Sequence, residues 1–278
     1  MHLQALASKS FEYRKTILGI IKRANAGHTG GSLSCIDILN VLYNCVLNIS
    51  PENLNSPDRD RYIHSKGHSV EALYTVLADK GFFDREELNT LCAYNSHYVG
   101  HPTRMVRGIE HNTGALGHGL SVAVGIALAG KIDHRTYRVY TLLGDGELSE
   151  GSNWEACMAA AHYQLDNLVI IIDRNMLQIT GGTEQVMRLE PLENKFEAFG
   201  CAVRVADGHD FAALLDTFHQ IPLESGKPSV IIARTIKGKG ISFIENQVSW
   251  HHHVPNDVEF TNAMNELNSA MNHRNIEP

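Results

Sequence analysis

The sequence predicts an α/β fold in which a doubly wound, mostly parallel sheet carries helices on both faces. One reason is the alternation of short apolar runs with amphipathic segments from residue 137 onward, because such alternation gives parallel strands joined by right-handed crossovers. A second is the run Leu168–Ile172, whose continuous aliphatic side chains are typical of a strand that is covered on both faces. The length of 278 residues is ample for one buried core of this kind.

The N-terminal part is expected to be helical. Apolar side chains recur at helical spacing over residues 3–25, with lysines between them. The segment 27–31 is expected to be a loop, because it is too rich in glycine to continue a helix. Ser34 is expected to cap the next helix, with Asp37 three residues later as in a capping box.

The middle of the chain combines helices with irregular segments. Prolines and a glycine break residues 51–67, and residues 68–80 are expected to be helical again. The stretch 95–113 reads as a long loop, and loops of that length inside a domain are usually functional or disordered. A helix rich in glycine and alanine is expected over residues 117–130.

The alternating part begins with a strand at 137–143 and a helix at 150–163, followed by the strand at 168–172. The remaining expected elements are a helix at 191–199, a strand at 202–206, a helix at 210–221, a strand at 229–234 and an amphipathic helix after Pro255 with a frayed end.

Composition excludes several classes of protein. A net charge of −7 is unlike the basic face of a nucleic-acid-binding protein, so no nucleic acid is expected as a partner. No apolar run approaches the ~20 residues that cross a bilayer, and the first residues lack the pattern of a signal peptide. The five cysteines show no CxxC spacing, which favours a reduced protein without a disulfide framework. We therefore expect a cytoplasmic protein that does not bind membranes.

Two polar side chains follow two predicted strands. Asp145 comes after the strand at 137–143, between two glycines that let the backbone approach a ligand closely. Asn175 follows the strand at 168–172. If these strands are neighbours, both residues project into the crevice at the carboxyl ends of the strands, where open α/β sheets bind ligands. A carboxylate and an amide oxygen suit Mg²⁺, with Ca²⁺ or Mn²⁺ as alternatives, holding a phosphorylated ligand, and they do not suit zinc.

The chain contains sixteen histidines, several of them beside glycines in predicted loops. His28, His68, His101 and His251 come from four separate loops. A single loop histidine is more often an exposed polar residue than a catalyst. Because the usual pKa of histidine is near 6.5, such residues can nevertheless accept and donate protons at neutral pH.

These segments resemble, in the same order along the chain, the motifs of transketolases. The spacing of Gly144-Asp145-Gly146 and Asn175 resembles the thiamine diphosphate signature of that family. The other matching segments are Gly27–Ser34 (GHTGGSLS), Ser65–His68 (SKGH), Gly100–Pro102 (GHP), Thr113–Gly119 (TGALGHG), Gly144–Gly151 (GDGELSEG), and Lys237–Gly240 (KGKG) with Trp250-His251.

The resemblance implies a thiamine diphosphate-binding fold, with the cofactor held through a divalent metal ion, and implies a role for each matching residue. The metal ligands are Asp145, Asn175 and the backbone carbonyl of Leu177. Three histidines, His28, His101 and His251, face the sugar as catalytic groups, and Glu150 joins a proton relay across a subunit interface. The cofactor-binding residues are His68, Gly114, Ala115, Leu116, Gly146, Asn175 and His251.

Two positions depart from the family pattern. Ala115 stands where the family usually has proline in the loop beside the cofactor ring, a mild change because the contacts there are mainly made by the backbone. His252 stands where the last histidine is normally followed by glycine, and its bulk puts the loop shape and the choice of sugar in question.

The resemblance also implies that this chain works with a partner. Residues 1–278 are expected to form a single domain that binds the cofactor diphosphate. The pyrimidine-binding domain, with the glutamate that activates the cofactor, and the C-terminal domain are expected on a separate chain in an α2β2 heterotetramer. The chain would then be inactive alone. With its partner it would transfer a two-carbon ketol unit from a ketose phosphate to an aldose phosphate.

Three alternatives remain open at this point. The chain could belong to another thiamine diphosphate enzyme, either a 2-oxo-acid dehydrogenase or a synthase of the deoxyxylulose-phosphate type. Histidines on the sugar side disfavour the dehydrogenase, and such a synthase usually carries its second domain on the same chain. It could also be a non-catalytic regulatory paralogue, although the metal and histidine residues are all present.

Overall fold

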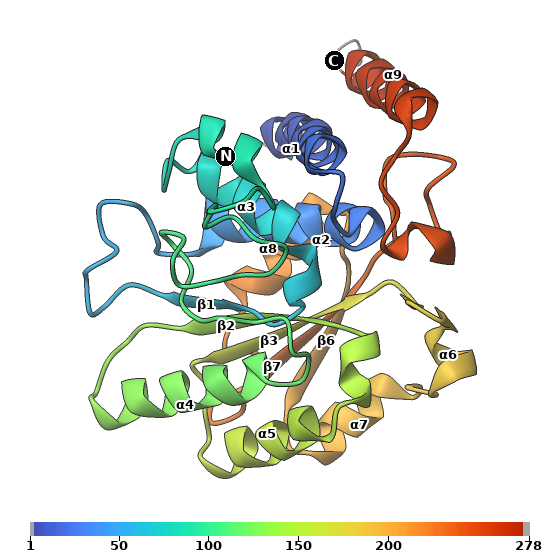
Figure 1. The fold of residues 1–278 in the computed structure, drawn as a ribbon. Coiled ribbons are helices and arrows are strands. Elements are labelled where there is room, and N and C mark those ends of the chain that lie inside the picture. Colours follow the sequence, from blue (N-terminus) through green and yellow to red (C-terminus); the bar gives the residue numbers. More distant parts are fainter. Residues whose placement is uncertain (1–2, 275–278) are drawn as a thin grey trace.

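A five-stranded parallel sheet forms the centre of the computed structural model, which describes residues 3–274 (Figure 1). The strand order is β1-β2-β3-β7-β6, and every neighbouring pair is parallel. The strands are β1 (Arg61–His64), β2 (Val139–Gly144), β3 (Leu168–Arg174), β7 (Ser229–Arg234) and β6 (Ala202–Asp207). All residues of β2 and β3 are buried, as expected for central strands that are covered on both faces.

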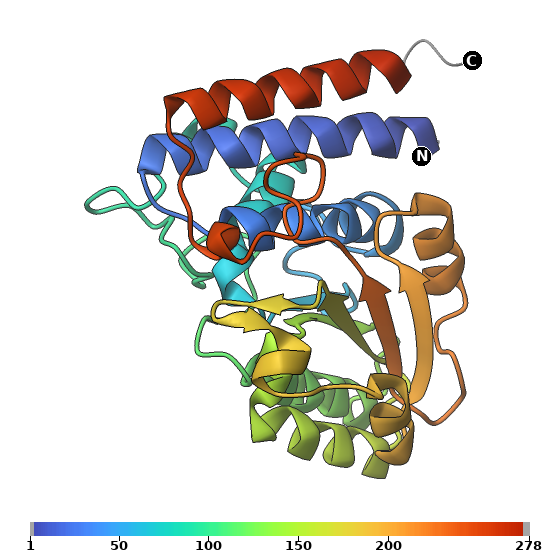
Figure 2. The same ribbon diagram turned by 90° about the vertical axis from the view of Figure 1, so that its right-hand side faces the viewer.

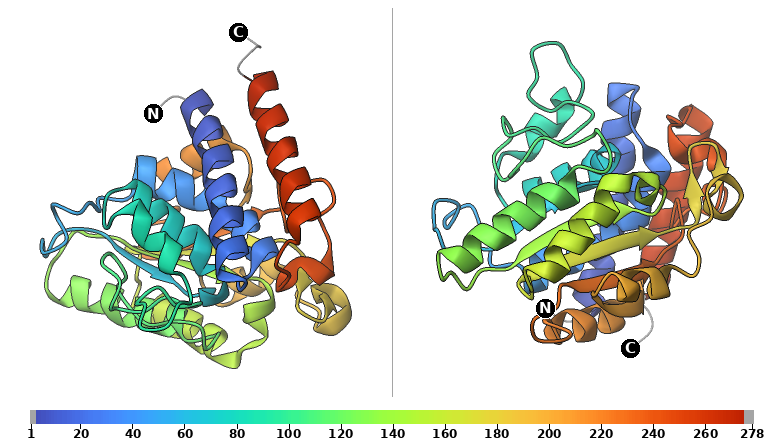
Figure 3. Two further views of the ribbon diagram at one scale, coloured as in Figure 1. Left: turned by 45° about the horizontal axis from the view of Figure 1, so that its top comes forward. Right: turned by 90° about the horizontal axis from the view of Figure 1, so that it is seen from below.

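Helices cover both faces of this sheet (Figure 1). Above it lie α1 (Leu3–Ala24), α2 (Thr29–Val41), α3 (Val70–Asp79) and α8 (Phe211–His219). Below it lie α4 (Gly119–Ile132), α5 (Gly151–His162) and α7 (Leu192–Ala198), and the view from below shows α4 and α5 side by side (Figure 3). The long helix α9 (Asp257–Arg274) runs along α1 on the outside (Figure 2).

Alternate strand residues serve two separate cores. Ile171 and Ile231 pack into the cluster formed with α1, α2, α3 and α8, whereas Ile170 and Ile172 pack into the cluster formed with α4, α5 and α7. This is the period of two that a strand imposes on its side chains. The predicted α/β class, with helices on both faces of a parallel sheet, is confirmed.

Short elements complete the fold and carry much of the site described below. They are the π-helix η1 (Leu42–Val46), the 3-10 helices η2 (Gly67–Ser69), η3 (Arg85–Thr90), η4 (Gly146–Ser149) and η5 (Val248–His251), the strands β4 (Leu177–Gln178) and β5 (Gly181–Gly182), and the single-turn helix α6 (Thr183–Val186). Within residues 3–274, no helix is both long and apolar enough to cross a membrane.

Apart from the start of α2, the predicted helices and the strands from residue 137 onward appear within a few residues of their expected limits. The strand β1 was not predicted, because four residues between a proline-rich loop and a glycine give little periodic signal. The β4–β5 hairpin was also missed. Of the expected C-terminal helix, residues 275–278 lie outside the described part of the chain, so a frayed end stays untested.

The prediction for segment 27–31 was wrong in part. Helix α2 begins at Thr29 and includes Gly30 and Gly31 in its first turn, and His28 occupies the N-cap position. Ser34 therefore lies inside the helix rather than capping it, and its hydroxyl donates to Asp173 at 2.7 Å. The glycines are needed for packing: a Cβ on Gly30 would lie 2.8 Å from the carbonyl oxygen of Trp250.

A buried charged network ties the first two helices to the sheet edge. Arg14 of α1 binds both carboxylate oxygens of Asp37 on α2, at 2.9 and 2.7 Å. His209 Nδ1 lies 2.8 Å from Asp37, and its Nε2 accepts the backbone N–H of Ile236 at 2.8 Å. Burial alone would raise the pKa of Asp37, but Arg14 and His209 hold it well below its usual range. The ionised carboxylate therefore connects α1, α2 and the segment after β7.

Replacing Asp37 by alanine is expected to lower the free energy of unfolding by about 3–5 kcal/mol, because it leaves the buried Arg14 guanidinium unpaired. Urea denaturation followed by circular dichroism measures this loss. Glu224→Ala, which removes the partner of Lys227 in an exposed pair, serves as the control and should cost less than about 1 kcal/mol. Equal, small losses in both variants would show that the network is not a structural connection.

Candidate functional site

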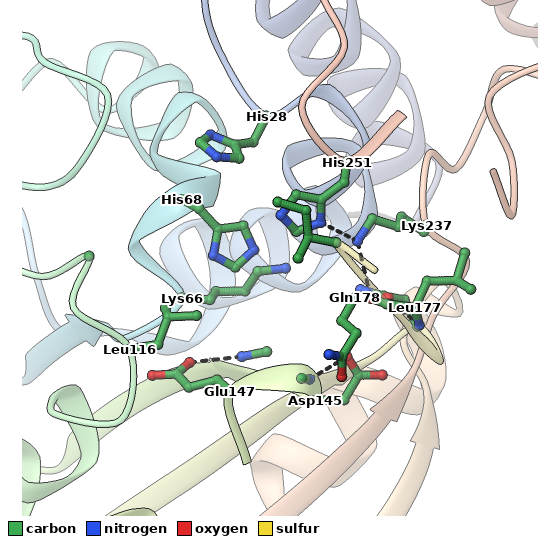
Figure 4. A pocket seen from close by; sticks show the side chains of 15 residues that line it. His28, Lys66, His68, Leu116, Asp145, Glu147, Leu177, Gln178, Lys237 and His251 are labelled. Carbon is green, nitrogen blue, oxygen red and sulfur yellow. Dashed lines mark hydrogen bonds between the residues drawn. The ribbon is translucent and has the colours of Figure 1, made fainter. Parts of the chain in front are cut away.

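A cavity of about 300 Å³ lies where β2 and β3 end, at the carboxyl edge of the sheet (Figure 4). This is the position at which open α/β sheets bind ligands. Histidines line one side of it and acidic residues the other (Figure 4). The lining residues are His28, Lys66, His68, Gly114, Leu116, Gly144, Asp145, Gly146, Glu147, Asn175, Leu177, Gln178, Ile179, Lys237 and His251.

Asp145 is a buried carboxylate directly after β2, with 2% of its surface exposed. Its Oδ1 accepts the N–H of Gly146 at 2.8 Å, and its Oδ2 accepts the N–H of Met176 at 2.6 Å and a guanidinium N–H of Arg174 at 3.1 Å. Burial and the charge of Asp173 raise the pKa of Asp145, while Arg174 opposes this rise. A cation in the cavity would stabilise the ionised carboxylate in the same sense as Arg174 does.

Asn175 and Leu177 bring two further oxygens to this edge. Gly144 is paired in register with Asp173, so the residues after β2 and at the end of β3 are neighbours, as expected from the sequence. The side-chain oxygen of Asn175 accepts the N–H of Leu177 at 3.1 Å. The carbonyl oxygen of Leu177 accepts an N–H of the Lys237 ammonium at 3.1 Å. The carbonyl oxygen of Leu177 therefore already binds one cationic group, the Lys237 ammonium.

This set of oxygens fits a hard divalent cation. A carboxylate, an amide and a backbone carbonyl are the ligand types that Mg²⁺ and Ca²⁺ prefer, and Mg²⁺ usually completes its shell with phosphate oxygens and water. Two other polar atoms at the cavity, His28 Nδ1 and Gln178 Oε1, are buried without a hydrogen-bond partner among the described residues. Buried polar atoms are normally paired, so the cavity is suited to a polar ligand.

Two lysines give the cavity its positive charge. Lys66 is buried and forms an ion pair with Asp173, which is fully buried as well. Although burial alone would raise the pKa of Asp173, the charge of Lys66 lowers it. Lys237 has no carboxylate partner within the described chain, and burial together with Lys66 lowers its pKa to about 8. An anionic diphosphate beside Lys237 would raise this pKa again.

The loop 113–119 forms another wall of the cavity, beside the segment that carries Lys66, and is fixed by Glu147. The carboxylate of Glu147 accepts the N–H of Gly117 at 3.0 Å and that of Gly144 at 3.1 Å, and it accepts the Ser65 hydroxyl as well. Positive φ angles at Gly114 (133°) and Gly117 (90°) shape the loop, a conformation that glycine adopts without strain. A buried carboxylate thus holds the loop against the end of β2.

The three other predicted histidines, together with His252, gather around His28. The ring centroid of His28 lies 5.5 Å from that of His68, 6.1 Å from that of His101 and 5.7 Å from that of His251. The ring of His252 lies closest to it, at 4.5 Å and nearly perpendicular. The side chain at the unusual position 252 therefore fills space directly beside His28.

The histidines that line the cavity are neutral at physiological pH. Burial, together with the charges of neighbouring histidines and lysines, lowers the pKa of His28 and of His251 to about 3. The same causes lower the pKa of His68 well below its usual value. His251 Nδ1 lies 2.8 Å from Lys237 Nζ, so it accepts a hydrogen bond from the ammonium and the proton of its own ring resides on Nε2. Neutral imidazoles can act as proton acceptors.

Not every residue singled out from the sequence lines the cavity. His101 is exposed and packs against Gly114, where a Cβ would lie 2.6 Å from its ring. Ala115 is exposed at the tip of its loop. Glu150 is exposed at the N-cap of α5, beside Gly117. The other predicted residues, namely His28, His68, Gly114, Leu116, Asp145, Gly146, Asn175, Leu177 and His251, line it together.

Sequence reasoning did not identify several polar groups at the site. Lys66, Glu147 and Lys237 all lie inside quoted motifs, but their burial could not be read from the sequence. Arg174 binds Asp145 and also Glu184 and Glu190, at 2.8 and 2.9 Å, and so holds the segment after β5 near the carboxylate. The sequence signal for Arg174 was its position between Asp173 and Asn175, directly after the predicted strand.

A further buried carboxyl, that of Glu71 on α3, lies behind His28. Its two oxygens accept the backbone N–H of His28 at 3.1 Å and the Ser32 hydroxyl at 2.7 Å. Its side chain is fully buried, and no lysine or arginine among residues 3–274 forms an ion pair with it. Burial raises the pKa of Glu71 to about 7. The carboxyl therefore changes its charge near neutral pH.

Comparison with known proteins places this chain in a family. Residues 10–269 match the model of the thiamine diphosphate-binding domain of transketolase. The chain is 47% identical over 271 residues to one of the subunits of the apulose-4-phosphate transketolase of Phocaeicola vulgatus, covering 98% of this chain and 96% of that protein. It is 44% identical over 240 residues to a 6-deoxy-6-sulfo-D-fructose transketolase subunit of a Clostridium species, covering 86% of this chain and 87% of that protein.

The crystal structure of transketolase from Campylobacter jejuni superposes on 99% of this chain with a TM-score of 0.84 and 29% sequence identity. The matched region is 48% of the Campylobacter chain, so this chain spans about half the length of that enzyme.

The charge of Glu71 predicts a pH dependence of stability. Because its pKa is 4.5 ordinarily and about 7 in the fold, its contribution to stability is fully present below pH 4.5 and is lost as the pH rises to 7. Glu71→Gln mimics the protonated acid. Between pH 4.5 and pH 8, the free energy of unfolding of this variant relative to the unaltered chain should therefore rise by about 3 kcal/mol.

Chemical denaturation at several pH values measures this difference. Thr75→Val, on the same helix, is the control: it removes a hydroxyl that bonds to the Glu71 carbonyl at 2.8 Å and should shift stability equally at every pH. A constant difference between Glu71→Gln and the unaltered chain would mean that Glu71 does not titrate in this range.

Proposed function

Since the chain belongs to the transketolase family, we propose that it is the N-terminal, diphosphate-binding subunit of a two-chain transketolase. With its partner it transfers a two-carbon ketol unit from a ketose phosphate to an aldose phosphate. The observation that carries the proposal is the cavity itself. Hard oxygens and two lysines lie on one side, and neutral histidines lie on the other.

In this proposal, Asp145, Asn175 and the carbonyl of Leu177 hold Mg²⁺, and the Mg²⁺ holds the diphosphate of thiamine diphosphate. Lys237 is close enough to the same carbonyl to neutralise part of the diphosphate charge. Gly146 lets the backbone approach the diphosphate. A larger residue does not fit at this position, because its Cβ would lie 2.9 Å from the Cβ of Gln178. His68 completes the diphosphate end of the site.

The loop of Gly114, Ala115 and Leu116 supports the cofactor ring with its backbone. The chemistry that thiamine diphosphate supplies when bound is a nucleophilic carbon that permits cleavage of the bond next to a ketone. All other groups needed for proton transfer belong to the protein.

The histidines carry out these proton transfers. His28, His101 and His251 remove a proton from the donor hydroxyl and return one to the acceptor carbonyl oxygen. A neutral imidazole is suited to the first of these steps, and burial keeps His28 in that form, with its Nδ1 unpaired among the described residues. Because Lys237 donates a hydrogen bond to His251 Nδ1, the ring proton of His251 lies on Nε2, where it is available to a ligand as a hydrogen-bond donor.

The partner in this proposal is a C-terminal subunit on a separate chain, arranged as an α2β2 heterotetramer. Support comes from the relatives of similar length that are named as subunits. It also comes from the outer face of α4 and α5, where Ile132, Met158 and Tyr163 are at least half exposed. A Cβ on Gly125 would meet no atom within 4 Å, so this face is open for close packing.

Glu150 lies at the edge of the same face, which suits the relay role that the family implies. The inner face of α4, with Leu120, Ala123 and Ala127, packs against the chain's own sheet. The small residues of this helix therefore serve packing on both of its sides.

The most specific part of the proposal concerns which sugar is the donor. The 47% identity to a protein whose name specifies apulose 4-phosphate makes this ketose phosphate the first donor to test, beside xylulose 5-phosphate. We place the enzyme in the cytoplasm, where its five cysteines, all free in the structure, remain reduced.

The proposal predicts ketol transfer by the pair of chains and by neither chain alone. The chain is co-expressed with its candidate partner, supplied with thiamine diphosphate and Mg²⁺, and assayed with both ketose phosphates and ribose 5-phosphate. Asp145→Ala should reduce the rate on the order of 100-fold or more, because it removes a metal ligand. Removing the metal with EDTA should abolish activity, and Mg²⁺ should restore it.

Asp216→Ala removes an exposed carboxylate from α8 and is the matched control, expected to retain full activity. Turnover by the isolated chain would overturn the two-chain proposal. A complex that binds the cofactor but turns over neither ketose would keep the binding site and reject these donors.

A further inference from the structure

Glu71 holds the segment that carries His28 without reaching the cavity itself. His28 is the N-cap residue of α2, and its side chain makes no capping bond. Glu71 supplies the cap from another helix, by accepting the His28 N–H and the hydroxyl of Ser32. Ser32 in turn donates its backbone N–H to the His28 carbonyl at 3.1 Å. The unpaired N–H groups and positive dipole end of α2 favour a carboxylate at this place.

The chain approaches this carboxyl more closely than a side chain would allow. Gly27, directly before His28, has a φ of 147°, and a Cβ there would lie 2.7 Å from Glu71 Oε1. The backbone path into His28 is therefore shaped around the carboxyl. The His28 imidazole makes no capping hydrogen bond. Its position therefore depends on the main chain of His28 and on the neighbouring rings, whose centroids lie 4.5 Å or more from its own.

We propose that Glu71 is a positioning residue for His28, fixing through the main chain where the imidazole lies against the substrate. The proposal rests on the proposed function, in which His28 faces the sugar. A misplacement of about 1 Å can cost on the order of 100-fold in rate, so the backbone anchor of a catalytic group matters as much as its ring.

The anchor responds to pH. The ionisable groups around Glu71 are His28 on the preceding loop, Tyr74 on its own helix and Cys92 on the loop after η3. Burial keeps His28 neutral and raises the pKa values of Tyr74 and Cys92, so Glu71 is the group of this cluster that changes charge near pH 7. Hydrogen bonds to an ionised acceptor are roughly twice as strong as neutral ones. The anchor therefore tightens as the pH rises.

Two substitutions separate positioning from a bulk structural role. Glu71→Gln keeps an oxygen for the His28 N–H and an amide for Ser32, but it cannot ionise. Glu71→Leu keeps the volume and loses both acceptors. Each variant is studied in the complex with the partner chain, thiamine diphosphate and Mg²⁺, with Thr75→Val as the control for a lost hydrogen bond on α3.

Glu71→Leu should lower kcat/KM about 10- to 100-fold, while its dissociation constant for thiamine diphosphate changes less than about threefold. Glu71→Gln should restore kcat/KM, and its pH profile should lack the rise near pH 7 that we expect for the unaltered complex. The proposal is wrong if Glu71→Leu keeps its kcat/KM, if it loses cofactor binding in proportion to activity, or if Glu71→Gln keeps the rise near pH 7.

A measurement without turnover distinguishes this proposal from the proposed function. Ring signals of ¹⁵N-labelled histidines are recorded for the complex, with His28 assigned from the spectrum of His28→Gln. Glu71→Leu should shift the His28 signals and leave those of His209 in place, whereas Thr75→Val should shift neither. If no ketose is turned over but His28 shifts, the assigned reaction fails and the positioning role stands. Unmoved His28 signals overturn the positioning role.

Discussion

The buried ion pair of Lys66 and Asp173 is the contact on which the site depends most. Asp173, at the end of β3, also accepts hydrogen bonds from Ser34 on α2, from the Asn175 amide and from Thr235 after β7. Lys66 lies two residues before His68. One carboxylate thus joins four segments that are far apart in the sequence and sets their relative positions. Such a pair persists in a dry interior only because its remaining oxygens are also bonded.

This network divides the cavity into two chemically different halves. Next to Asp173, the charged groups balance one another, except for Lys237, which has no carboxylate partner within the described chain. Farther out, burial and the same lysines hold the imidazoles neutral. The positive charge that favours an anionic ligand therefore also adds to burial in keeping His28 and His251 neutral.

The sequence predicted the parallel sheet and the pairing of Asp145 with Asn175, because both follow from strand patterns and from what adjacent strand ends bring together. It did not predict that α2 starts at Thr29, since helical glycines are tolerated there for close contact with Trp250. Nor could it distinguish Glu147, buried under the loop 113–119, from Glu150, which is exposed three residues later. Burial depends on long-range packing, and local patterns do not carry it.

The N-terminal end of α5 links the cavity to the outer face of the molecule. Ser152 donates to the Gly117 carbonyl at 2.7 Å, while Glu147 accepts the N–H of the same glycine at 3.0 Å. The loop 113–119 is therefore held from both sides by residues flanking Glu150, which itself is exposed beside the apolar face of α4 and α5. In the proposed assembly, a chain packed on that face would contact the segment that shapes the cavity. Partner binding and the form of the site would then be connected through Gly117.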